Sequence, residues 1–477
     1  MSMDPYNPLS RRQLLQSSCL SFGWLAASEV MRESVFAYPG GLDLKPRRGD
    51  HEGPVKSVIL LTQVGGPSQM DLFDPKPELE RLHGKTISDT TFETLQPGSE
   101  SQTLMKSPFT MKQHGDCGMY FSELMPEMAS IADQWCMVNS MYGAHNNHPQ
   151  AQRFFHSGKT QALWPTMGSW ICYALGSENQ NMPGFVVLRD PKGYTDGGAN
   201  HWTSGWLPAT FAGTEIRSEG DAVLNLNSSR DESKQFRERK AKLIQTLNRK
   251  RQQLFPGEDR LETRIQNYEL AARMQLNANR ILDLSGETET TLANYGVNEE
   301  HTSDFGKRCL MARRMVEAGV RFVEVMVTVG VSTSPYDNHG NLKGGLEAIC
   351  PRVDKPTAAL IRDLKQRGLL DSTLVIWSGE FGRLPISQNG NGRDHNRNAF
   401  TLLAAGGGFK AGYSHGATDD IGYKAVEERI SVHDFHATLL HQMGVDHEFL
   451  SYPHNGRDER LTDPEVTGAR IAEELIA

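Results

Sequence analysis

The run Val58-Ile59-Leu60-Leu61-Thr62, which leads into Gly65-Gly66-Pro67-Ser68, decides the fold class. Such a short and nearly continuous apolar run predicts a strand that is buried on both faces. The glycines and the proline that follow it predict a loop. In open α/β sheets the loops at the carboxyl ends of the strands carry the functional site. We therefore expect this loop to border the site.

Further strands and helices alternate along the chain. Apolar runs predict strands at residues 185–188, 320–327, 372–377 and 400–405. Apolar residues at helical spacing predict helices at 122–138, 305–318, 353–367 and 435–443. This alternation predicts an α/β fold with a doubly wound, mainly parallel sheet that has helices on both faces. We expect it to form a single domain over residues 50–470.

The composition excludes several classes of protein. The chain has 477 residues, a formal net charge of −8 and a mean hydropathy of −0.50. The acidic balance argues against a nucleic-acid partner, and no apolar run is long enough for an integral membrane span. The six cysteines are scattered, so they indicate neither a disulfide framework nor a CxxC zinc site. The motifs of serine esterases, P-loop NTPases and Rossmann dehydrogenases do not occur.

The first 37 residues resemble an export signal. Ser10-Arg11-Arg12-Gln13-Leu14-Leu15 matches a twin-arginine motif, and a weakly apolar stretch follows up to Ala27. An ordinary basic helix is the alternative interpretation. The signal predicts export by the twin-arginine translocase to the periplasm or the extracellular space.

Residues 221–284 differ from the rest in being rich in Lys, Arg, Glu and Gln. Two helical stretches, 230–254 and 259–282, predict a solvated helical hairpin that is packed by one apolar stripe. We expect a helical insertion at about 221–300. The mixture of acids and bases argues against a nucleic-acid arm, and an oligomerisation arm remains open.

Acids and imidazoles follow or precede the predicted strands at four places. The candidate metal ligands are Asp71, Asp74, Asp337, His339, Glu380, Asp394 and His395. Parallel topology brings such loops to one edge of the sheet. Carboxylates with neutral imidazoles suit Zn²⁺, Mn²⁺ or Fe²⁺, whereas an all-oxygen set suits Mg²⁺ or Ca²⁺. The alternative for each Asp-His pair is a hydrogen-bonded loop anchor.

Two other segments are rich in histidine, and we expect a different role for each. In the first, His145 and His148 precede Arg153 and a Ser157-Gly158-Lys159 turn, and a planar guanidinium there could bind an oxyanion. A turn with surface histidines is the alternative. In the second, residues 433–454, we expect structural histidines, with Asp434 as a helix N-cap.

The order of these motifs resembles a known family. GGPSQMDLFDPKP, HNNHPQ, FGKRCLMARRMVEAGVRFVEV, YDNHG, LVIWSGEFGR, GRDHN and AFTLLAAGGGFKAG follow a twin-arginine start. Together they resemble the sulfatase-like "domain of unknown function 1501" family, within the alkaline phosphatase superfamily. The resemblance implies an alkaline phosphatase-like sheet and a one- or two-metal site. It implies that Asp337, His339 and His395 bind one metal and that Glu380 and Asp71 or Asp74 lie near a second.

The chain departs from the superfamily pattern at two positions. Phe381 replaces an expected histidine, and His148 falls close to where a hydroxyl or thiol-derived nucleophile is expected. The leading hypothesis is an exported hydrolase of phosphate or sulfate esters that uses Zn, Mn or Ca. In it His148, Arg153 and Arg383 act in catalysis. The alternative is an inactive superfamily member that binds an anionic polysaccharide, such as a sulfated one, or an envelope partner.

Overall fold

A computed structural model describes residues 43–93, 98–189, 193, 195–218, 281–327 and 334–477, together with scattered positions between 235 and 274. The twin-arginine motif and most of the predicted hairpin at 221–284 lie outside the described residues. Among the residues described, no helix combines the length and the apolar character that a membrane crossing requires.

Strand β1 (Ser57–Gln63) lies in the middle of a nine-stranded sheet and is buried along its whole length. It pairs in parallel with β7 (Phe322–Val327) on one side and β8 (Thr373–Ser378) on the other. Its neighbours and the helices on both faces exclude water from every side chain, which explains the continuous apolar run.

The strand order is β12-β4-β11-β8-β1-β7-β5-β6, and β15 also pairs with β4. The remaining strands are β4 (Cys136–Tyr142), β5 (Phe185–Leu188), β6 (Thr214–Ile216), β11 (Phe400–Ala405), β12 (Tyr413–His415) and β15 (Ile430–Ser431). Strand β11 is antiparallel to both β8 and β4, whereas the other described pairs of this sheet are parallel. The amino end of β11 therefore lies at the same edge as the carboxyl ends of its neighbours.

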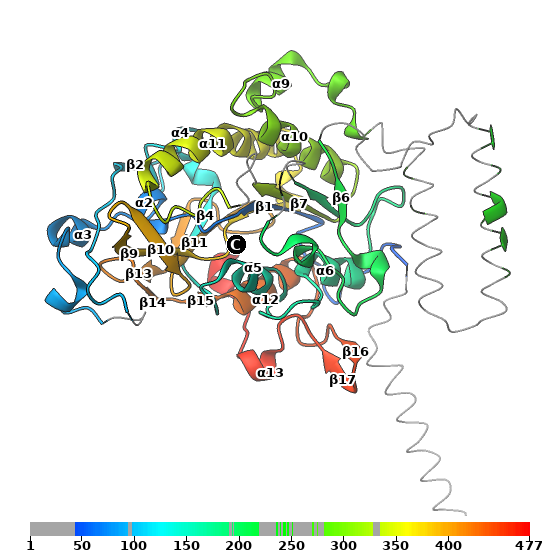
Figure 1. Cartoon of the computed structure of the whole chain (residues 1–477). Coiled ribbons are helices and arrows are strands. Elements are labelled where there is room, and N and C mark those ends of the chain that lie inside the picture. The colour runs from blue at the N-terminus through cyan, green and yellow to red at the C-terminus, as the bar shows by residue number, and fades with distance from the viewer. Residues whose placement is uncertain are drawn as a thin grey trace, which may run out of the picture.

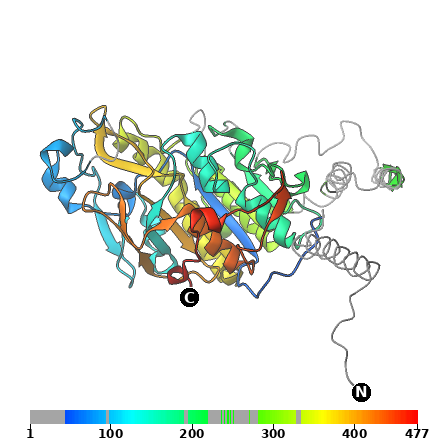
Figure 2. The same ribbon diagram turned by 90° about the horizontal axis from the view of Figure 1, so that it is seen from below.

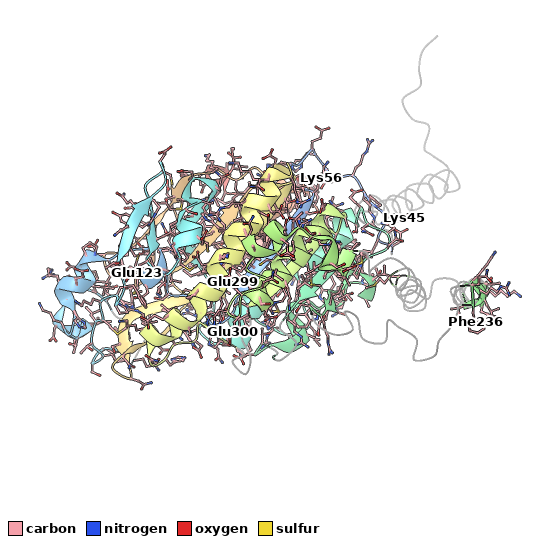
Figure 3. The ribbon with its side chains drawn as sticks, turned by 90° about the horizontal axis from the view of Figure 1, so that it is seen from above. Lys45, Lys56, Glu123, Phe236, Glu299 and Glu300 are labelled. Atoms are coloured by element: carbon pink, nitrogen blue, oxygen red, sulfur yellow. The ribbon has the colours of Figure 1, made fainter. Side chains whose placement is uncertain are left out.

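Helices cover both faces of the sheet, as Figure 1 shows. One face carries α10 (Ser303–Glu317) and the long α11 (Leu342–Gln366), and Figure 3 looks onto it. The other carries α5 (His148–Ser157), α6 (Met167–Leu175) and α12 (Val432–Gln442), which Figure 2 shows from below. This arrangement confirms the predicted α/β fold with a mainly parallel sheet.

Smaller elements decorate this core. They are α2 (Gln69–Leu72), α3 (Pro77–Leu82), β2 (Met111–His114), β3 (Met119–Ser122), α4 (Pro126–Ala129), α9 (Glu289–Asn294), β9 (Gly382–Gln388), β10 (Gly392–Asn396), β13 (Ala417–Thr418), β14 (Ala425–Glu427), β16 (Tyr452–His454), β17 (Arg457–Glu459) and α13 (Pro464–Thr467). Strands β9 and β10 form an antiparallel hairpin, so the GRDHN segment is a strand in its own right.

The prediction of one helix over residues 122–138 was wrong. Only α4 is α-helical there, a short 3₁₀ helix spans Ala132–Gln134, and β4 begins at Cys136. The hydroxyl of Ser130 donates to the carbonyl oxygen of Glu127 at 2.6 Å, a local bond that competes with helix continuation. Most apolar side chains of this stretch are buried, but by turns rather than by one helix face.

Two helix starts also differ from prediction. Helix α11 begins at Leu342 and runs through Pro351 and Pro356, whereas the prediction began at residue 353. The N-cap of α12 is Ser431, not Asp434. Asp434 is the third helical residue, where its carboxylate accepts from the Ser431 backbone in a capping box.

Candidate metal centre

Four side chains meet at the carboxyl edge of the sheet. Asp337 and His339 follow β7, His148 opens α5 beyond β4, and His395 lies in β10 shortly before β11. Because β11 is antiparallel to its neighbours, the β10 segment that precedes it lies at the same edge of the sheet as the loops that follow the parallel strands. One ligand atom from each of the four lies within 4.8 Å of all the others.

The four groups converge on one carboxylate oxygen. Oδ1 of Asp337 lies 2.9 Å from Nε2 of His339, 3.0 Å from Nε2 of His395 and 3.2 Å from Nε2 of His148. The Nε2 atoms of His339 and His395 are 2.9 Å apart. Three imidazoles thus point the same ring nitrogen at one place.

The opposite nitrogen of each ring faces an oxygen that only accepts. Nδ1 of His148 lies 2.6 Å from Oε1 of Glu380, and Nδ1 of His395 lies 2.6 Å from the carbonyl oxygen of Asn146. Nδ1 of His339 contacts the side-chain oxygen of Gln388. Each Nδ1 therefore carries the proton, and in the neutral ring the lone pair is on Nε2.

These donors fit a divalent metal. Three imidazole lone pairs and a carboxylate oxygen repel one another unless a cation lies among them. Nε2 of His148 is buried and has no hydrogen-bond partner among the described residues, although it lies close to Asp337. A ring held by a carboxylate or carbonyl at Nδ1 is the usual arrangement of a metal-binding histidine.

Glu380 lies behind His148 rather than within the cluster. Besides His148, its carboxylate accepts hydrogen bonds from the backbone N–H of Gly65 at 3.1 Å and from Nε2 of Gln152 at 3.2 Å. Burial opposes ionisation of this carboxyl, but the bond from His148 outweighs it and lowers the pKa of Glu380. The backbone at Gly65 has φ +111°, and a Cβ at this position would lie only 2.7 Å from the backbone nitrogen of Asp337. Only glycine therefore fits at this position.

Two further pKa values reflect this concentration of charge. Burial opposes ionisation of Asp337, but the imidazoles of His148, His339 and His395 around its carboxylate hold its pKa well below the usual value. Burial also opposes protonation of His148, but Asp337 and Glu380 raise its pKa to about 9. The carboxylates of Asp337 and Glu380 therefore stabilise a positive charge at the centre.

The predicted catalytic arginines lie in different surroundings. Arg383 is buried and donates to the carbonyl oxygens of Gly66 (2.9 Å) and Arg393 (3.0 Å) and to Oδ1 of Asp337 (2.8 Å). It positions Asp337 and joins the β9–β10 hairpin to the loop after β1. Arg153 is half-buried on α5, where its Nε donates to the carbonyl oxygen of Pro149 at 2.6 Å.

The structure does not bring Asp71 or Asp74 into the cluster. Asp71 is fully buried against Arg393, with 2.7 Å between Oδ2 and Nε. Asp74 pairs with Lys76 at 2.9 Å and accepts from Thr418 at 2.5 Å. Asp394 lies at the margin, where Oδ1 is 3.8 Å from Nδ1 of His339.

Two residues beside the centre, Gln152 and Gln388, went unnoticed in the sequence. Gln152 follows His148 by four residues, and that helical spacing was the available signal. Gln388 reaches His339 from β9, and no local pattern indicates this contact. Phe381 is buried with its ring centroid 4.9 Å from that of His148 and 4.6 Å from that of His395. It restricts the positions of both imidazoles.

The late histidines support α5 instead. Nε2 of His433 lies 2.9 Å from the carbonyl oxygen of Gly158, and Nε2 of His436 lies 2.8 Å from that of Phe155. These contacts agree with the structural role predicted for this cluster.

A family model described as "Protein of unknown function (DUF1501)" matches residues 55–475. The chain belongs to this family. The match covers every residue of the centre in this DUF1501 protein. A comparison with curated proteins finds no match.

The solved structures that the comparison finds share little sequence with this DUF1501 protein. Ps i-CgsB has 10% identity and a TM-score of 0.37, covering 84% of this chain and 73% of that one. The PsFucS1 sulfatase from Pseudoalteromonas sp. has 11% identity and a TM-score of 0.33, covering 87% and 74%. A protein in the alkaline phosphatase superfamily from Vibrio parahaemolyticus has 9% identity and a TM-score of 0.34, covering 84% and 69%.

Proposed function

We propose that this DUF1501 protein is a metal-dependent hydrolase of phosphate or sulfate esters. The observation that carries the proposal is the convergence of His148, His339 and His395 on Asp337, with each Nε2 turned inward. A divalent cation held by these four residues would supply Lewis acidity for ester hydrolysis.

The donor set favours some cations over others. Three imidazole nitrogens and one carboxylate oxygen suit Zn²⁺ or Mn²⁺, whereas Ca²⁺ prefers six to eight oxygen ligands. Of the cations expected from sequence, we therefore propose Zn²⁺ or Mn²⁺ rather than Ca²⁺.

The chain's own residues have distinct tasks in this proposal. Glu380 holds His148 in the tautomer that presents Nε2, and Arg383 orients Asp337 and offsets its charge. Phe381 excludes water from one side of His148 and His395. Arg153 is the candidate for contact with the ester's anionic oxygens, since Arg383 already donates to four protein oxygens.

Metal analysis and an ester panel test the proposal together. We expect bound metal in the wild type, its loss in His339→Ala and its retention in His51→Ala, a control at an exposed histidine. Hydrolysis of aryl phosphates, aryl sulfates or a sulfated polysaccharide should be lost with the metal. A wild-type protein without metal, or unchanged metal content in His339→Ala, would contradict the metal site.

A binding protein for an anionic polysaccharide or an envelope partner is the second candidate. It is favoured by Arg383, whose guanidinium is occupied by the protein, and by His148, which lies among the metal-ligand candidates where a hydroxyl nucleophile was expected. Binding of a sulfated polysaccharide without turnover when divalent metal is supplied, with an affinity that a chelator does not change, would support this candidate over the hydrolase.

For location, we propose export by the twin-arginine translocase to the periplasm or the extracellular space. The motif at residues 10–15 supports it. Replacement of both Arg11 and Arg12 by Lys should retain the protein in the cytoplasm.

A further inference from the structure

Helix α5 carries a stripe of three buried polar side chains. His148, Gln152 and His156 follow one another at intervals of four residues, so they lie along one ridge of the helix. His148 and Gln152 both contact Oε1 of Glu380, at 2.6 and 3.2 Å. His156 is the third member of the stripe, and it contacts a different carboxylate.

His156 is paired with Glu324, a carboxylate within the central sheet. Its Nε2 lies 2.8 Å from Oε1 of Glu324, and its Nδ1 lies 2.7 Å from the carbonyl oxygen of Gln152. Since both oxygens accept hydrogen bonds, both ring nitrogens carry protons and the ring is an imidazolium. Burial opposes this protonation, but the carboxylate of Glu324 raises the pKa of His156. The contact is therefore a buried ion pair between α5 and β7.

This ion pair is a poor source of stability. The side chain of Glu324 is completely buried on β7, which is paired with another strand on either side. Thr62 donates a 2.7 Å hydrogen bond to Oε1 of Glu324, but Oε2 has no hydrogen-bond partner among the described residues. A buried carboxylate with an unpaired oxygen costs free energy, and an apolar pair of similar volume often gives equal or greater stability. The pair therefore indicates a role other than stability.

The pair links the two segments that supply the metal centre. Glu324 lies on β7, the strand that precedes Asp337 and His339, and His156 lies on the helix that begins with His148. Because an α-helix is a rigid element, a contact about two turns beyond its first residue fixes the rotation and the axial position of that residue. The ion pair thus holds His148 in register with Asp337.

We propose that Glu324 and His156 are positioning residues of the metal centre, which set the place of Nε2 of His148 through α5. The inference rests on the metal site proposed above, but not on the hydrolysis of esters. It gives a role to a buried carboxylate that lies outside the four-ligand cluster.

A variant without the ion pair tests this role. In Glu324→Leu/His156→Met, apolar side chains of similar volume replace both charges, so the protein should fold. We expect the metal-free variant to resist urea as well as the metal-free wild type does. It should nevertheless bind Zn²⁺ about 10-fold more weakly, which competition with a chromogenic chelator measures. The visible absorption of the Co²⁺-loaded protein, which depends on coordination geometry, should shift as well.

His436→Leu is the matched control. His436 is also fully buried and also anchors α5, but its Nε2 contacts the backbone carbonyl of Phe155 in the last turn rather than a side chain of the stripe. This variant should lose stability and keep the Zn²⁺ affinity and the Co²⁺ spectrum of the wild type. An equal loss of affinity in His436→Leu would show that any loosening of α5 disturbs His148, and would overturn the proposal.

Two other results would overturn it. One is an unchanged Zn²⁺ affinity and Co²⁺ spectrum in a folded Glu324→Leu/His156→Met protein, or in His156→Gln if the double variant does not fold. That result, with metal bound by the wild type, would leave the proposed metal site intact. The other is a wild type that binds no divalent metal, which would overturn the metal site as well. Because the measurement is metal affinity, its outcome does not depend on whether the protein hydrolyses esters.

Discussion

Nδ1 of His148 lies 2.6 Å from Oε1 of Glu380, and that carboxylate also accepts from Gln152, one helical turn further along α5. Since an ionised carboxylate only accepts, this contact fixes the proton on Nδ1 and turns Nε2 toward Asp337. A residue outside the four-ligand cluster thus orients one of its members.

Replacement of Glu380 by Gln should therefore weaken metal binding without removing a ligand. We expect a loss of affinity of about 10–100-fold, the usual cost of losing such a partner. Competition with a chromogenic chelator measures it. Glu428→Gln, at a side chain that is 66% exposed, is the control. Equal affinity in Glu380→Gln and wild type would show that packing against Phe381 alone orients His148.

Metal removal should lower the free energy of unfolding. A ligand at 100 times its Kd stabilises the folded state by about 2.7 kcal/mol. Zn²⁺ added at that ratio to chelator-treated protein should raise the urea midpoint accordingly. It should have no such effect on His339→Ala or His395→Ala. A midpoint that Zn²⁺ leaves unchanged in the wild type would contradict a cation in this centre.

The buried pair Asp71–Arg393 should affect stability and not metal affinity. Both side chains are fully buried, and Asp71→Ala leaves the guanidinium without its carboxylate. We expect a loss of about 3–5 kcal/mol in the free energy of unfolding, measured by urea titration. Asp71→Leu/Arg393→Met, which removes both charges, should recover most of it. Loss of bound metal in a folded Asp71→Asn protein would place Asp71 among the ligands instead.

Asp354 should give stability a distinctive pH dependence. Its carboxylate accepts from the backbone N–H groups of Glu127 (2.8 Å) and Met128 (2.7 Å). Burial nevertheless raises its pKa from 3.8 to about 6. The folded state holds this proton more tightly than the unfolded state. The contribution to stability is therefore complete below pH ~4 and is lost as the pH rises through about 6.

The size of this contribution is at most about 3 kcal/mol. Urea titrations of wild type and Asp354→Asn between pH ~4 and ~7 isolate it, because other titrating groups are common to both proteins. The wild type should lose stability relative to the variant as the pH rises. The opposite slope would show that the two backbone bonds outweigh burial.

Local patterns predicted much of the fold. The apolar runs at β1, β7, β8 and β11 are buried, and burial on both faces imposes a continuous apolar sequence. The strand ends then place Asp337, His339 and His395 at one edge. The same reasoning failed for residues 122–138, where apolar spacing arose from buried turns.

The ligand set depended on contacts between distant segments. Asp71 and Asp337 both follow predicted strands, and no local signal separates them. The carboxylate of Asp71 pairs with Arg393, which lies 322 residues further along the chain, whereas the carboxylate of Asp337 contacts three imidazoles. Likewise, the sequence predicted Glu380 as a metal ligand, but in the structure His148 of α5 lies between Glu380 and Asp337.

The sequence by itself determined the layered α/β architecture, because apolar periodicity and glycine punctuation are local consequences of burial and backbone freedom. It also determined at which edge of the sheet Asp337, His339 and His395 lie. Only the tertiary structure decided which acids and imidazoles share one centre and which nitrogen each ring presents. Those choices depend on hydrogen bonds between residues as far apart as His148 and Glu380, 232 positions along the chain.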